Sequence, residues 1–570
     1  MPRPWFKRRY RDYEIEPDQI FLDDANLSNL DRQQFEGVIE SPIRNRSLLA
    51  LGGFFVLVFL LFLGRLVVLQ IADGQDFFAQ SENNRLRQVP LFAERGIIYD
   101  RNNVEIAWNT RPNEGDDATF SYRAYTPLSG HGHLLGYVSY PQKDSSGNFW
   151  RYALEGQAGL EKKYNDLLAG VNGAELIETD AGLNAISTNT IATAISGENL
   201  ITTVDSRIQH NLYEAIRLQA EAGGFQGGAG SIMNIRTGEL IAFTSYPEFD
   251  PYTIAEGDDV EAIRGFFNDS RKPFLNRVLS GVYSPGSTVK PFLGIGALNE
   301  GLITDQTTIL STGRIEVPNP YNPSAPSVFV DWRSGGHGVT DIYHAIADSV
   351  NTFFYAIGGG YRGQEGLGIS RIEEYARAFG IAEPTGIDFG DEALGTIPNP
   401  DWKEKTFADG TWRLGDTYNT SIGQFGFQVT PIQMTRAVAA IANDGILVTP
   451  MLIRQEPEKT PVPIDIPAED YAIIRRAMRE TVTTGTSGIV NVPEVAMAAK
   501  TGTAQVGVDN EFYNSWIVGF FPYDNPRYSF SIVMERAPEW SDGSAGRAMR
   551  EFITRVTEDY PEFWQDPTLD

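Results

Sequence analysis

The sequence predicts an α+β protein with three parts: a single membrane-spanning helix, an extended β-rich module, and a C-terminal domain built on an antiparallel sheet flanked by helices. Three observations support this prediction. First, residues 47–64 form an apolar run without a charged side chain. Second, short strand-like runs separated by Gly and Asn fill residues 73–195. Third, strand patterns occur at both ends of residues 196–558, around a mostly helical middle. One sheet completed by the return of the chain explains this order.

The composition is that of a globular chain long enough for several domains. The 570 residues include 56 Gly and 32 Pro, and 42% are hydrophobic, which excludes a fibrous or low-complexity protein. The formal net charge of -27 argues against a nucleic-acid ligand, because such proteins neutralise phosphates with clustered Lys and Arg. The absence of cysteine excludes disulfides, thiolate zinc sites and cysteine nucleophiles.

The first two segments are predicted to be a cytoplasmic tail, residues 1–46, and a transmembrane anchor, residues 47–72. The apolar run reaches the ~20 residues that a membrane span needs. Two arginines precede it and two aspartates follow it: Arg44, Arg46, Asp73 and Asp76. The positive-inside rule therefore places the N-terminus in the cytoplasm and the chain after residue 72 outside. A cleaved signal peptide is the competing interpretation, but the preceding tail is long and no small-x-small cleavage site follows.

Residues 73–195 are predicted to be an extended β-containing module, which we call the pedestal. Within it, residues 187–196 are predicted to be a linker or an edge strand. His131 and His133 are close in sequence, but no further ligand type lies near them, so we interpret them as ordinary loop residues and predict no metal there.

The C-terminal domain, residues 196–558, begins with a helix capped by Asp205, since Ile208, Leu212 and Ile216 recur every fourth position and a Gly-Gly pair follows. The remaining elements are a hairpin of residues 230–235 and 240–245, two strands at 515–521 and 528–534, and a helix from about 545 to 557. Residues 559–570 are predicted to be a C-terminal tail.

A candidate nucleophile and base lie at residues 282–291, Val-Tyr-Ser-Pro-Gly-Ser-Thr-Val-Lys-Pro. Pro285 and Gly286 favour a tight turn, and the apolar residues that follow predict a buried helix ending near Gly301. In such a helix Ser287 and Lys290 share a face, so the amine lies within reach of the hydroxyl. Ser-x-x-Lys also occurs by chance, and this pair alone does not identify a catalytic site.

Two further polar triplets are present. Ser349-Val350-Asn351 precedes an aromatic run, and Lys500-Thr501-Gly502-Thr503 follows a strand-like segment. Each has a structural alternative by itself, namely a helix cap and a strand end. Together, Ser-x-x-Lys, Ser-x-Asn and Lys-Thr-Gly in this order resemble the three motifs of the penicillin-recognising serine acyltransferases.

The resemblance extends over residues 44–556 and narrows to class B penicillin-binding proteins. The landmarks that carry it are residues 95–102, 159–164, 237–239, 245–251, 385–388 and 429–433. Three more segments resemble the cell-elongation type, penicillin-binding protein 2, more than the septal type: residues 336–338, 401–403 and 412–417.

The resemblance implies a peptidoglycan D,D-transpeptidase domain in which Ser287 attacks the bond between two terminal D-alanines and Lys290 is the base. A base at this position requires a depressed lysine pKa. Ser349 would relay a proton to the leaving amine, and Asn351 would hold Lys290 or the substrate amide. β-Lactam antibiotics would acylate Ser287.

The resemblance also assigns the Lys-Thr-Gly-Thr strand to substrate binding. Lys500 would provide a positive electrostatic potential at the site. Thr501 and Thr503, which are separated by Gly502, would bind the terminal carboxylate of the substrate. Backbone N–H groups of Ser287 and Thr503 would form the oxyanion hole. The implied partners are peptidoglycan stem peptides, a SEDS-family glycosyltransferase and scaffold proteins of the elongation complex. No cofactor is expected.

This sequence departs from the family at a few places. Some elongation-type relatives bind zinc through aspartates, a histidine and a cysteine; Asp331 and His337 match part of that pattern, but Val350 stands at the cysteine position, so we predict no metal. The family's Ile-Gly-Gln-Gly is Ile-Gly-Gln-Phe at residues 422–425, and Ala499 precedes Lys500 where Gly is usual. Both changes affect the groove that would receive the acceptor.

Four alternatives remain open from the sequence. They are a septal transpeptidase, a β-lactam receptor without cross-linking activity, a hydrolase such as a β-lactamase or D,D-carboxypeptidase, and a non-catalytic scaffold. Such receptors carry a His-Glu-x-x-His protease, and none of the five histidines forms that motif. The hydrolases usually lack a module like the pedestal.

Overall fold

The computed structural model describes residues 45–77, 86–111, 119–145, 147–179, 185–318, 322, 324–454, 460–538, 541 and 543–564. Most of the predicted cytoplasmic tail and the last six residues of the predicted C-terminal tail lie outside the described residues. The chain divides into two compact units, Met1–Arg87 with Glu178–Asn184, and Gln88–Ile177 with Ala185–Asp570.

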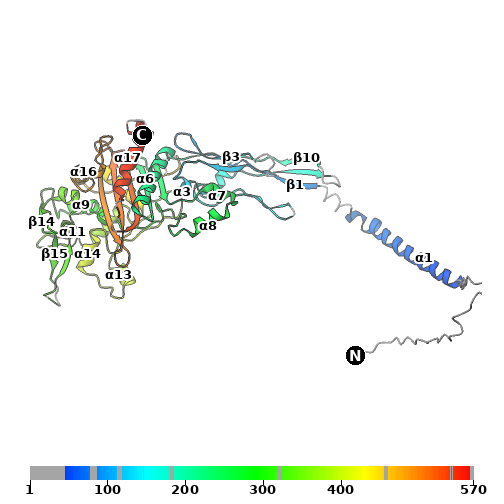
Figure 1. The fold of residues 1–570 in the computed structure, drawn as a ribbon, viewed down its shortest axis with the longest axis horizontal. Coiled ribbons are helices and arrows are strands. Elements are labelled where there is room, and N and C mark those ends of the chain that lie inside the picture. Colours follow the sequence, from blue (N-terminus) through cyan, green and yellow to red (C-terminus); the bar gives the residue numbers. More distant parts are fainter. Residues whose placement is uncertain are drawn as a thin grey trace, which may run out of the picture. The chain divides into compact units, whose positions relative to one another are not determined.

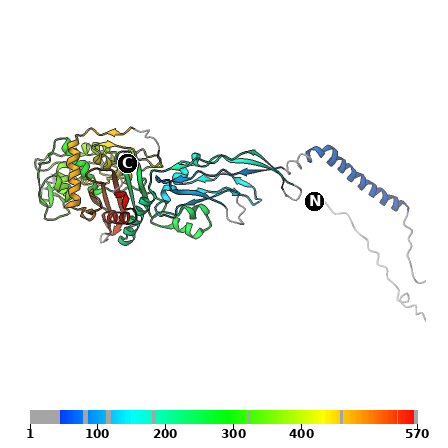
Figure 2. The ribbon, with the colours of Figure 1, turned by 90° about the horizontal axis from the view of Figure 1, so that it is seen from above.

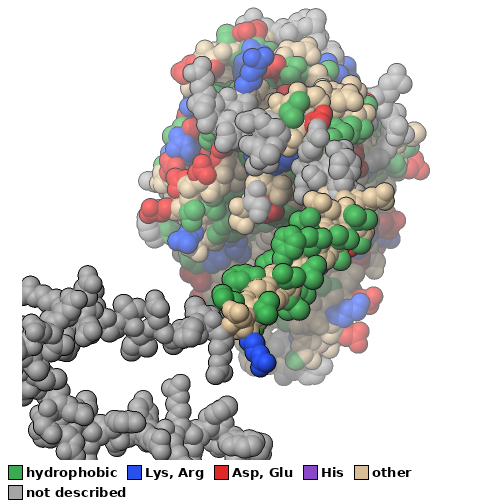
Figure 3. Space-filling model, turned by 90° about the vertical axis from the view of Figure 1, so that its right-hand side faces the viewer, with side chains coloured by type: hydrophobic (Ala, Val, Ile, Leu, Met, Phe, Trp, Pro, Cys, Tyr) green, Lys and Arg blue, Asp and Glu red, His purple; other side chains and the backbone are tan. Residues whose placement is uncertain are grey.

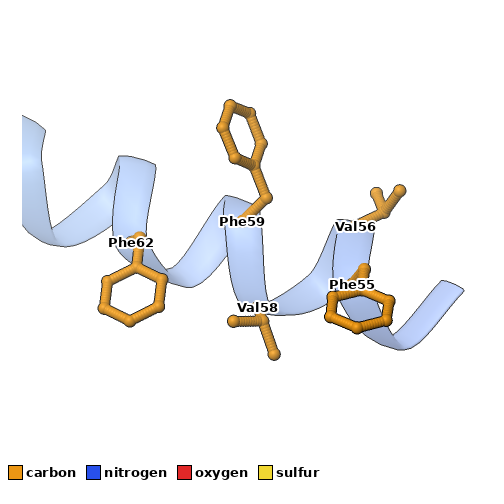
Figure 4. Close-up of a pocket in the computed structure, with 5 residues that line it drawn as sticks. All are labelled: Phe55, Val56, Val58, Phe59 and Phe62. Atoms are coloured by element: carbon orange, nitrogen blue, oxygen red, sulfur yellow. The ribbon is translucent and has the colours of Figure 1, made fainter. Parts of the chain in front are cut away.

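The apolar segment is a helix, as predicted. α1 (Asn45–Val67) continues into the π-helix η4 (Val68–Ala72), and the two together have a mean hydropathy of 2.6 over their most apolar window, none of it buried. Hydrophobic side chains cover the face of α1 seen in Figure 3. Phe59 and Val56 point to one side of the helix and Phe62 to the other (Figure 4). The helix is long enough to cross a bilayer, and its exposed apolar side chains suit the interior of a membrane.

The pedestal is β-rich, and its strands run alongside one another (Figure 2). One sheet has the order β1-β9-β10 and a second the order β11-β2-β3-β4. The strands are β1 (Leu86–Leu91), β2 (Ile98–Tyr99), β3 (Glu105–Thr110), β4 (Tyr122–Tyr125), β9 (Gly173–Thr179), β10 (Ala185–Ala192) and β11 (Leu200–Ile201). Of the two predictions for residues 187–196, the edge strand is correct, since β10 borders its sheet.

Short elements complete the pedestal. Two small ladders pair β5 (Val138–Ser139) with β8 (Glu155–Gly156) and β6 (Gln142–Lys143) with β7 (Phe149–Arg151), and the helices are α3 (Gly132–Leu135), α4 (Gly159–Lys163) and α5 (Asn165–Leu168). At their centre Glu161 of α4 accepts hydrogen bonds from Arg95 Nε at 2.6 Å and Arg123 Nε at 2.7 Å, and all three side chains are fully buried. This ion cluster ties α4 to β4 and to the segment before β2.

The C-terminal domain is built on a five-stranded sheet of order β13-β12-β22-β21-β20, in which every pairing is antiparallel. Its strands are β12 (Gly227–Asn234), β13 (Leu240–Tyr246), β20 (Ala498–Val506), β21 (Phe512–Phe521) and β22 (Tyr528–Pro538). The hairpin from the start of the domain thus pairs with the strands from its end, which confirms the predicted single sheet.

Helices cover both faces of this sheet. α6 (Ser206–Gly223) and α17 (Ala545–Asp559) pack together on one face, where Figure 1 shows them beside each other. On β21, Ile517 faces these helices, whereas its neighbours Trp516 and Val518 join the core on the α15 (Pro431–Ala442) side. This alternation follows from the period of two in a strand. As predicted, Asp205 caps α6 through Arg207 N and Ile208 N.

The middle of the domain is mostly helical, as predicted, with three additional two-stranded sheets among its described residues. The helices are α7 (Pro251–Glu256), α8 (Val260–Asn268), α9 (Lys290–Asn299), α10 (Ile342–Ala347), α11 (Asn351–Gly359), α12 (Gly368–Ala378), α13 (Pro400–Thr406), α14 (Leu414–Thr420), α15 and α16 (Ala468–Thr483). The small sheets pair β14 (Ile309–Ser311) with β17 (Gly338–Thr340), β15 (Arg314–Val317) with β16 (Ser327–Val330), and β18 (Ile446–Leu447) with β19 (Val462–Pro463).

A buried carboxylate joins the pedestal to the C-terminal domain. Glu248 accepts hydrogen bonds from Gly130 N at 2.6 Å and from Gly132 N at 2.8 Å. Burial raises its pKa to about 7. The interpretation as loop residues holds for His131, which precedes α3, and is wrong for His133, which lies within α3; both side chains are buried at this junction, and burial lowers the pKa of each to about 4.

Candidate active site

Ser287 lies in a turn that the surrounding backbone forces to be tight. Residues Gly286–Val289 form the 3-10 helix η5, and α9 begins only at Lys290, so Ser287 precedes the α-helix instead of opening it. Gly286 has φ +53°, and a Cβ there would lie 2.8 Å from Thr503 O. Its N–H donates to Gly423 O at 3.0 Å. Glycine is therefore required at this position, and the turn is fixed between β20 and the loop at Gly423.

The Lys290 side chain is fully buried and joins two of the predicted motifs. Its Nζ donates to Ser349 O at 2.8 Å, to Ser349 Oγ at 3.2 Å and to Asn351 Oδ1 at 2.7 Å. Ser349 has a left-handed backbone with φ +57° immediately before α11 starts at Asn351. Within the described part of the chain, the Lys290 amine bonds to these two residues and not to Ser287. The expected direct contact with the Ser287 hydroxyl is absent in this state.

Two buried amines give the site its electrostatic character. Burial, and then the nearby Lys500 charge, lower the pKa of Lys290 well below its ordinary value, while Asp331 opposes the change. Burial lowers the pKa of Lys500 to about 7, and Asp348 opposes it. Among the described residues, no carboxylate forms an ion pair with either amine. Burial therefore makes loss of the proton easier for both lysines than for a lysine exposed to water.

The predicted residues meet around one cavity of about 990 Å³. The motif residues that line it are Ser287, Ser349, Asn351, Thr501, Gly502 and Thr503. Lys500 also belongs to β20, but its side chain is fully buried and is not part of the cavity lining; its Nζ donates to Thr501 O at 2.9 Å. β20 is an edge strand, so its outer backbone groups face the cavity without a strand partner. The structure thus brings together all eight predicted site residues.

Other lining residues were not predicted from the sequence. They are Val330, Asp331, Trp332, Tyr355, Asn419, Ile422, Gln424, Phe425, Thr486, Ile489, Gln505, Ser515, Ser544 and Gly546. They come from seven stretches of the chain, and residues 330–332 and 419–425 contribute the most. Asp331 and Phe425 each had a signal in the sequence, because Asp331 belongs to the partial zinc pattern and Phe425 interrupts the motif at residues 422–425.

The residues at the partial zinc pattern do not suit a metal ion. His337 Nε2 lies 3.5 Å from Asp331 Oδ1, but Asp331 Oδ2 accepts hydrogen bonds from Thr352 N at 2.9 Å and Thr352 Oγ1 at 3.1 Å. Val350 is completely buried and offers only hydrocarbon. Within the described ranges, no group of three or more His, Cys, Asp or Glu side chains is placed to hold a metal ion. The absence of zinc remains a prediction.

A serine on a tight turn, a buried neutralisable lysine and an edge strand carrying Lys-Thr-Gly-Thr define the class of penicillin-recognising serine acyltransferases. The penicillin binding protein transpeptidase domain matches residues 228–554, and the penicillin-binding protein dimerisation domain matches residues 119–202. The first match spans more than half of the sequence. The chain belongs to the penicillin-binding protein transpeptidase family.

Individual relatives and solved structures agree with this assignment. The chain is 28% identical to peptidoglycan D,D-transpeptidase MrdA of Escherichia coli K12, over 90% of this chain and 93% of that protein. It is 29% identical to MrdA of Acinetobacter baumannii, over 88% and 86% respectively. Among structures, it resembles Pseudomonas aeruginosa PBP2 in complex with WCK 5153 (TM-score 0.66, 27% identity, 83% of this chain and 96% of that chain). It also resembles Helicobacter pylori PBP2 in complex with MreC (TM-score 0.68, 25% identity, 83% and 99%).

Proposed function

We propose that this protein is a peptidoglycan D,D-transpeptidase of the elongation type, held at the membrane by α1. The observation that carries the proposal is the placement of the Lys290 amine, buried and bonded to Ser349 and Asn351 behind the cavity that Ser287 lines. The elongation type is supported by the MrdA relatives, which share nearly their whole length with this chain.

Acylation follows from the positions of these groups. Ser287 Oγ attacks the carbonyl carbon between the two terminal D-alanines and transfers its proton to the Lys290 amine. The carbonyl oxygen becomes an oxyanion that the N–H groups of Ser287 and Thr503 stabilise. The two residues come from neighbouring segments, because a Cβ added to Gly286, the residue before Ser287, would lie 3.4 Å from Thr503 N. Lys290 Nζ donates to Ser349 and Asn351, so this proton transfer requires the amine to turn toward Ser287.

Collapse of this intermediate breaks the C–N bond. Ser349 Oγ, 3.2 Å from Lys290 Nζ, delivers a proton to the departing amine and regains one from Lys290, so D-alanine leaves as a neutral amine. An ester between Ser287 and the stem peptide remains. A primary amine from a second stem then attacks the ester, and the same groups run in reverse, which forms the cross-link and frees Ser287.

The substrate's terminal carboxylate is bound at β20. The Thr501 and Thr503 hydroxyls donate hydrogen bonds to this carboxylate, and the protonated, buried Lys500 amine attracts it electrostatically. Since the outer edge of β20 is open, the rest of the donor peptide extends along it and bonds to its backbone, as peptides do at other sheet edges.

The setting of this reaction is the outer surface of the cytoplasmic membrane. We place the N-terminal tail in the cytoplasm, because basic residues precede α1 and acidic residues follow it. The pedestal and the C-terminal domain then lie outside, where peptidoglycan is assembled. The Helicobacter pylori relative was solved in complex with MreC. We therefore assign this chain scaffold partners of the elongation complex, together with a SEDS-family glycosyltransferase.

Labelling with a fluorescent penicillin tests the nucleophile. Ser287→Ala and Lys290→Ala are each expected to lose labelling. Ser284→Ala is the matched control, because Ser284 precedes the same turn and its hydroxyl donates to Gly423 O at 3.0 Å. Labelling of Ser287→Ala at the wild-type level would show that another residue is acylated.

A second experiment separates the transpeptidase from a hydrolase. Purified lipid-linked pentapeptide and a glycan polymerase are supplied, and the muropeptides are separated by chromatography. Dimeric muropeptides that depend on Ser287 are expected. Release of D-alanine without dimers would instead identify a D,D-carboxypeptidase, and labelling without either product would identify a receptor.

A further inference from the structure

The cavity around Ser287 has two walls of different chemistry. One is the edge of β20, where Thr501, Gly502 and Thr503 present hydroxyl and backbone groups. A second group of lining residues comes from residues 330–332, Tyr355 and residues 419–425; it includes the polar residues Asp331, Asn419 and Gln424 and five apolar ones, Val330, Trp332, Tyr355, Ile422 and Phe425, which we call the apolar wall. The turn that carries Ser287 contacts both: Gly286 lies against Thr503 O and donates to Gly423 O.

Phe425 is the most unusual residue of the apolar wall. Its φ is +61°, a left-handed conformation that is strained for a bulky side chain and that persists only where the surroundings impose it. Its ring stacks on Phe407 with centroids 5.8 Å apart and planes 8° apart, and it contacts Trp402 at 5.7 Å and Trp412 at 5.9 Å edge-on. Three rings thus hold Phe425 in place.

Of these four rings, Phe425 is the one that lines the cavity within the described residues. The other three contact it and support a single aromatic ring at the wall of the cavity that Ser287 also lines. The Lys403 ammonium, 5.4 Å from the Phe425 ring centroid, is paired with Asp416 at 2.6 Å and does not occupy the cavity side.

We infer that Phe425 is a specificity-determining residue that binds the acceptor, an aliphatic primary amine carried by the second stem peptide. This inference rests on the proposed transpeptidase function. The donor peptide takes the β20 edge, because its carboxylate binds at Thr501 and Thr503. The apolar wall is then left for the second peptide, which carries the acceptor amine. An aromatic face suits the methylene chain of a diamino acid and attracts its ammonium before the proton is lost.

The wall also explains how amine is selected over water. A ring held beside the ester excludes loosely bound water from that side, whereas an aliphatic amine gains contact with it. Removal of the ring is thus expected to favour hydrolysis of the acyl-enzyme, while formation of the acyl-enzyme, which uses groups on β20 and Lys290, is nearly unchanged.

Phe425→Gly tests this, because Gly adopts the positive φ without strain and the loop keeps its path. A thioester donor that acylates Ser287 is mixed with a peptide carrying a diamino acid, and aminolysis and hydrolysis products are measured together. We expect the aminolysis-to-hydrolysis ratio to fall about 3- to 12-fold, the range typical of one aromatic contact. The rate of penicillin acylation is expected to change less than about twofold.

Phe407→Leu is the matched control, because it removes a ring from the cluster but not from the cavity wall. Its aminolysis-to-hydrolysis ratio is expected to stay near wild type, and Phe425→Tyr is expected to retain the ratio as well. Thermal melting checks that each variant is folded.

Three outcomes overturn the inference: an unchanged ratio in Phe425→Gly, an equal loss in Phe407→Leu, or a loss of acylation that matches the loss of aminolysis. A wild-type enzyme that hydrolyses the donor and never uses an amine would instead refute the transpeptidase function, and the acceptor site with it.

Discussion

In the pedestal, Arg95 and Arg123 are buried on either side of Glu161, whereas in the C-terminal domain Lys290 and Lys500 are buried with hydrogen bonds to neutral oxygen atoms only, among the described contacts. Both centres place two cationic side chains out of contact with water. They differ in the residue type and in whether a carboxylate is supplied.

The difference between the two centres separates a structural charge from a reactive one. A guanidinium stays protonated in proteins, so burial of arginine demands a partner, and Glu161 meets that demand for both. A lysine amine can lose its proton instead, and burial without a carboxylate lowers the pKa of Lys290 and Lys500. The missing partner is what makes Lys290 a base.

Lys290→Met should produce the largest effect. The acylation rate with a fluorescent penicillin is expected to fall by roughly 10²- to 10⁴-fold, since the general base is lost. The melting temperature should not fall, because methionine carries no charge to desolvate. Stopped-flow labelling and thermal melting measure the two effects.

Lys403 offers the contrasting control, since it is buried but paired with Asp416. Lys403→Met should lower the melting temperature and leave the acylation rate of the folded protein close to wild type. A rate for Lys290→Met within tenfold of wild type would contradict the assignment of the base.

Glu161→Gln tests the opposite half of the comparison. It leaves two buried guanidiniums without a counter-charge and is expected to lower the free energy of unfolding by about 3–5 kcal/mol. Urea unfolding measures this. Glu155→Gln, which removes an exposed pair with Arg151, should cost no more than about 1 kcal/mol. Equal effects of the two substitutions would show that the buried cluster is not special.

The pH dependence of the reaction should report Lys500. With a pKa of about 7, its amine is charged below that pH and attracts the substrate carboxylate, and the attraction is lost as the pH rises. The kcat/KM is therefore expected to decline above pH 7 by up to about tenfold per pH unit. Lys500→Arg keeps its charge and should remove this decline. A flat wild-type profile from pH 7 to 9 would exclude a role for the Lys500 charge.

Local patterns predicted much of this molecule from its sequence. The cap at Asp205, the hairpin and the apolar anchor depend on neighbouring residues, and the three motifs have recognisable spacing. Pro285 and Gly286 predicted the tight turn, but not that Ser287 lies in a 3-10 helix ahead of α9, because this geometry depends on contacts of Gly286 with two distant segments.

Long-range contacts account for the other failures. The pedestal ion cluster joins three positions that no periodicity relates: Arg95, Arg123 and Glu161. The residue types of a buried ion pair are also the same as those of an exposed one, so the sequence does not distinguish them. The wall at Phe425 depends on rings from α13 and the loop before α14. Burial of His131 and His133 depends on long-range contacts as well, so no local pattern predicts it.

Glu248 shares features with both kinds of centre, because it is a carboxylate like Glu161 and, among the described residues, is buried without an opposite charge like the two lysines. It is a buried carboxylate that accepts two backbone N–H groups, and its pKa is raised to about 7. The folded state thus holds a proton that the unfolded state releases between pH 4.5 and 7, so stability falls as the pH rises through this interval, by at most about 1.4 kcal/mol per pH unit. Glu248→Gln should flatten the difference between urea unfolding at pH 5 and pH 8. If the variant keeps the wild-type slope, Glu248 is ionised throughout, and the junction between pedestal and C-terminal domain holds a carboxylate by N–H groups alone.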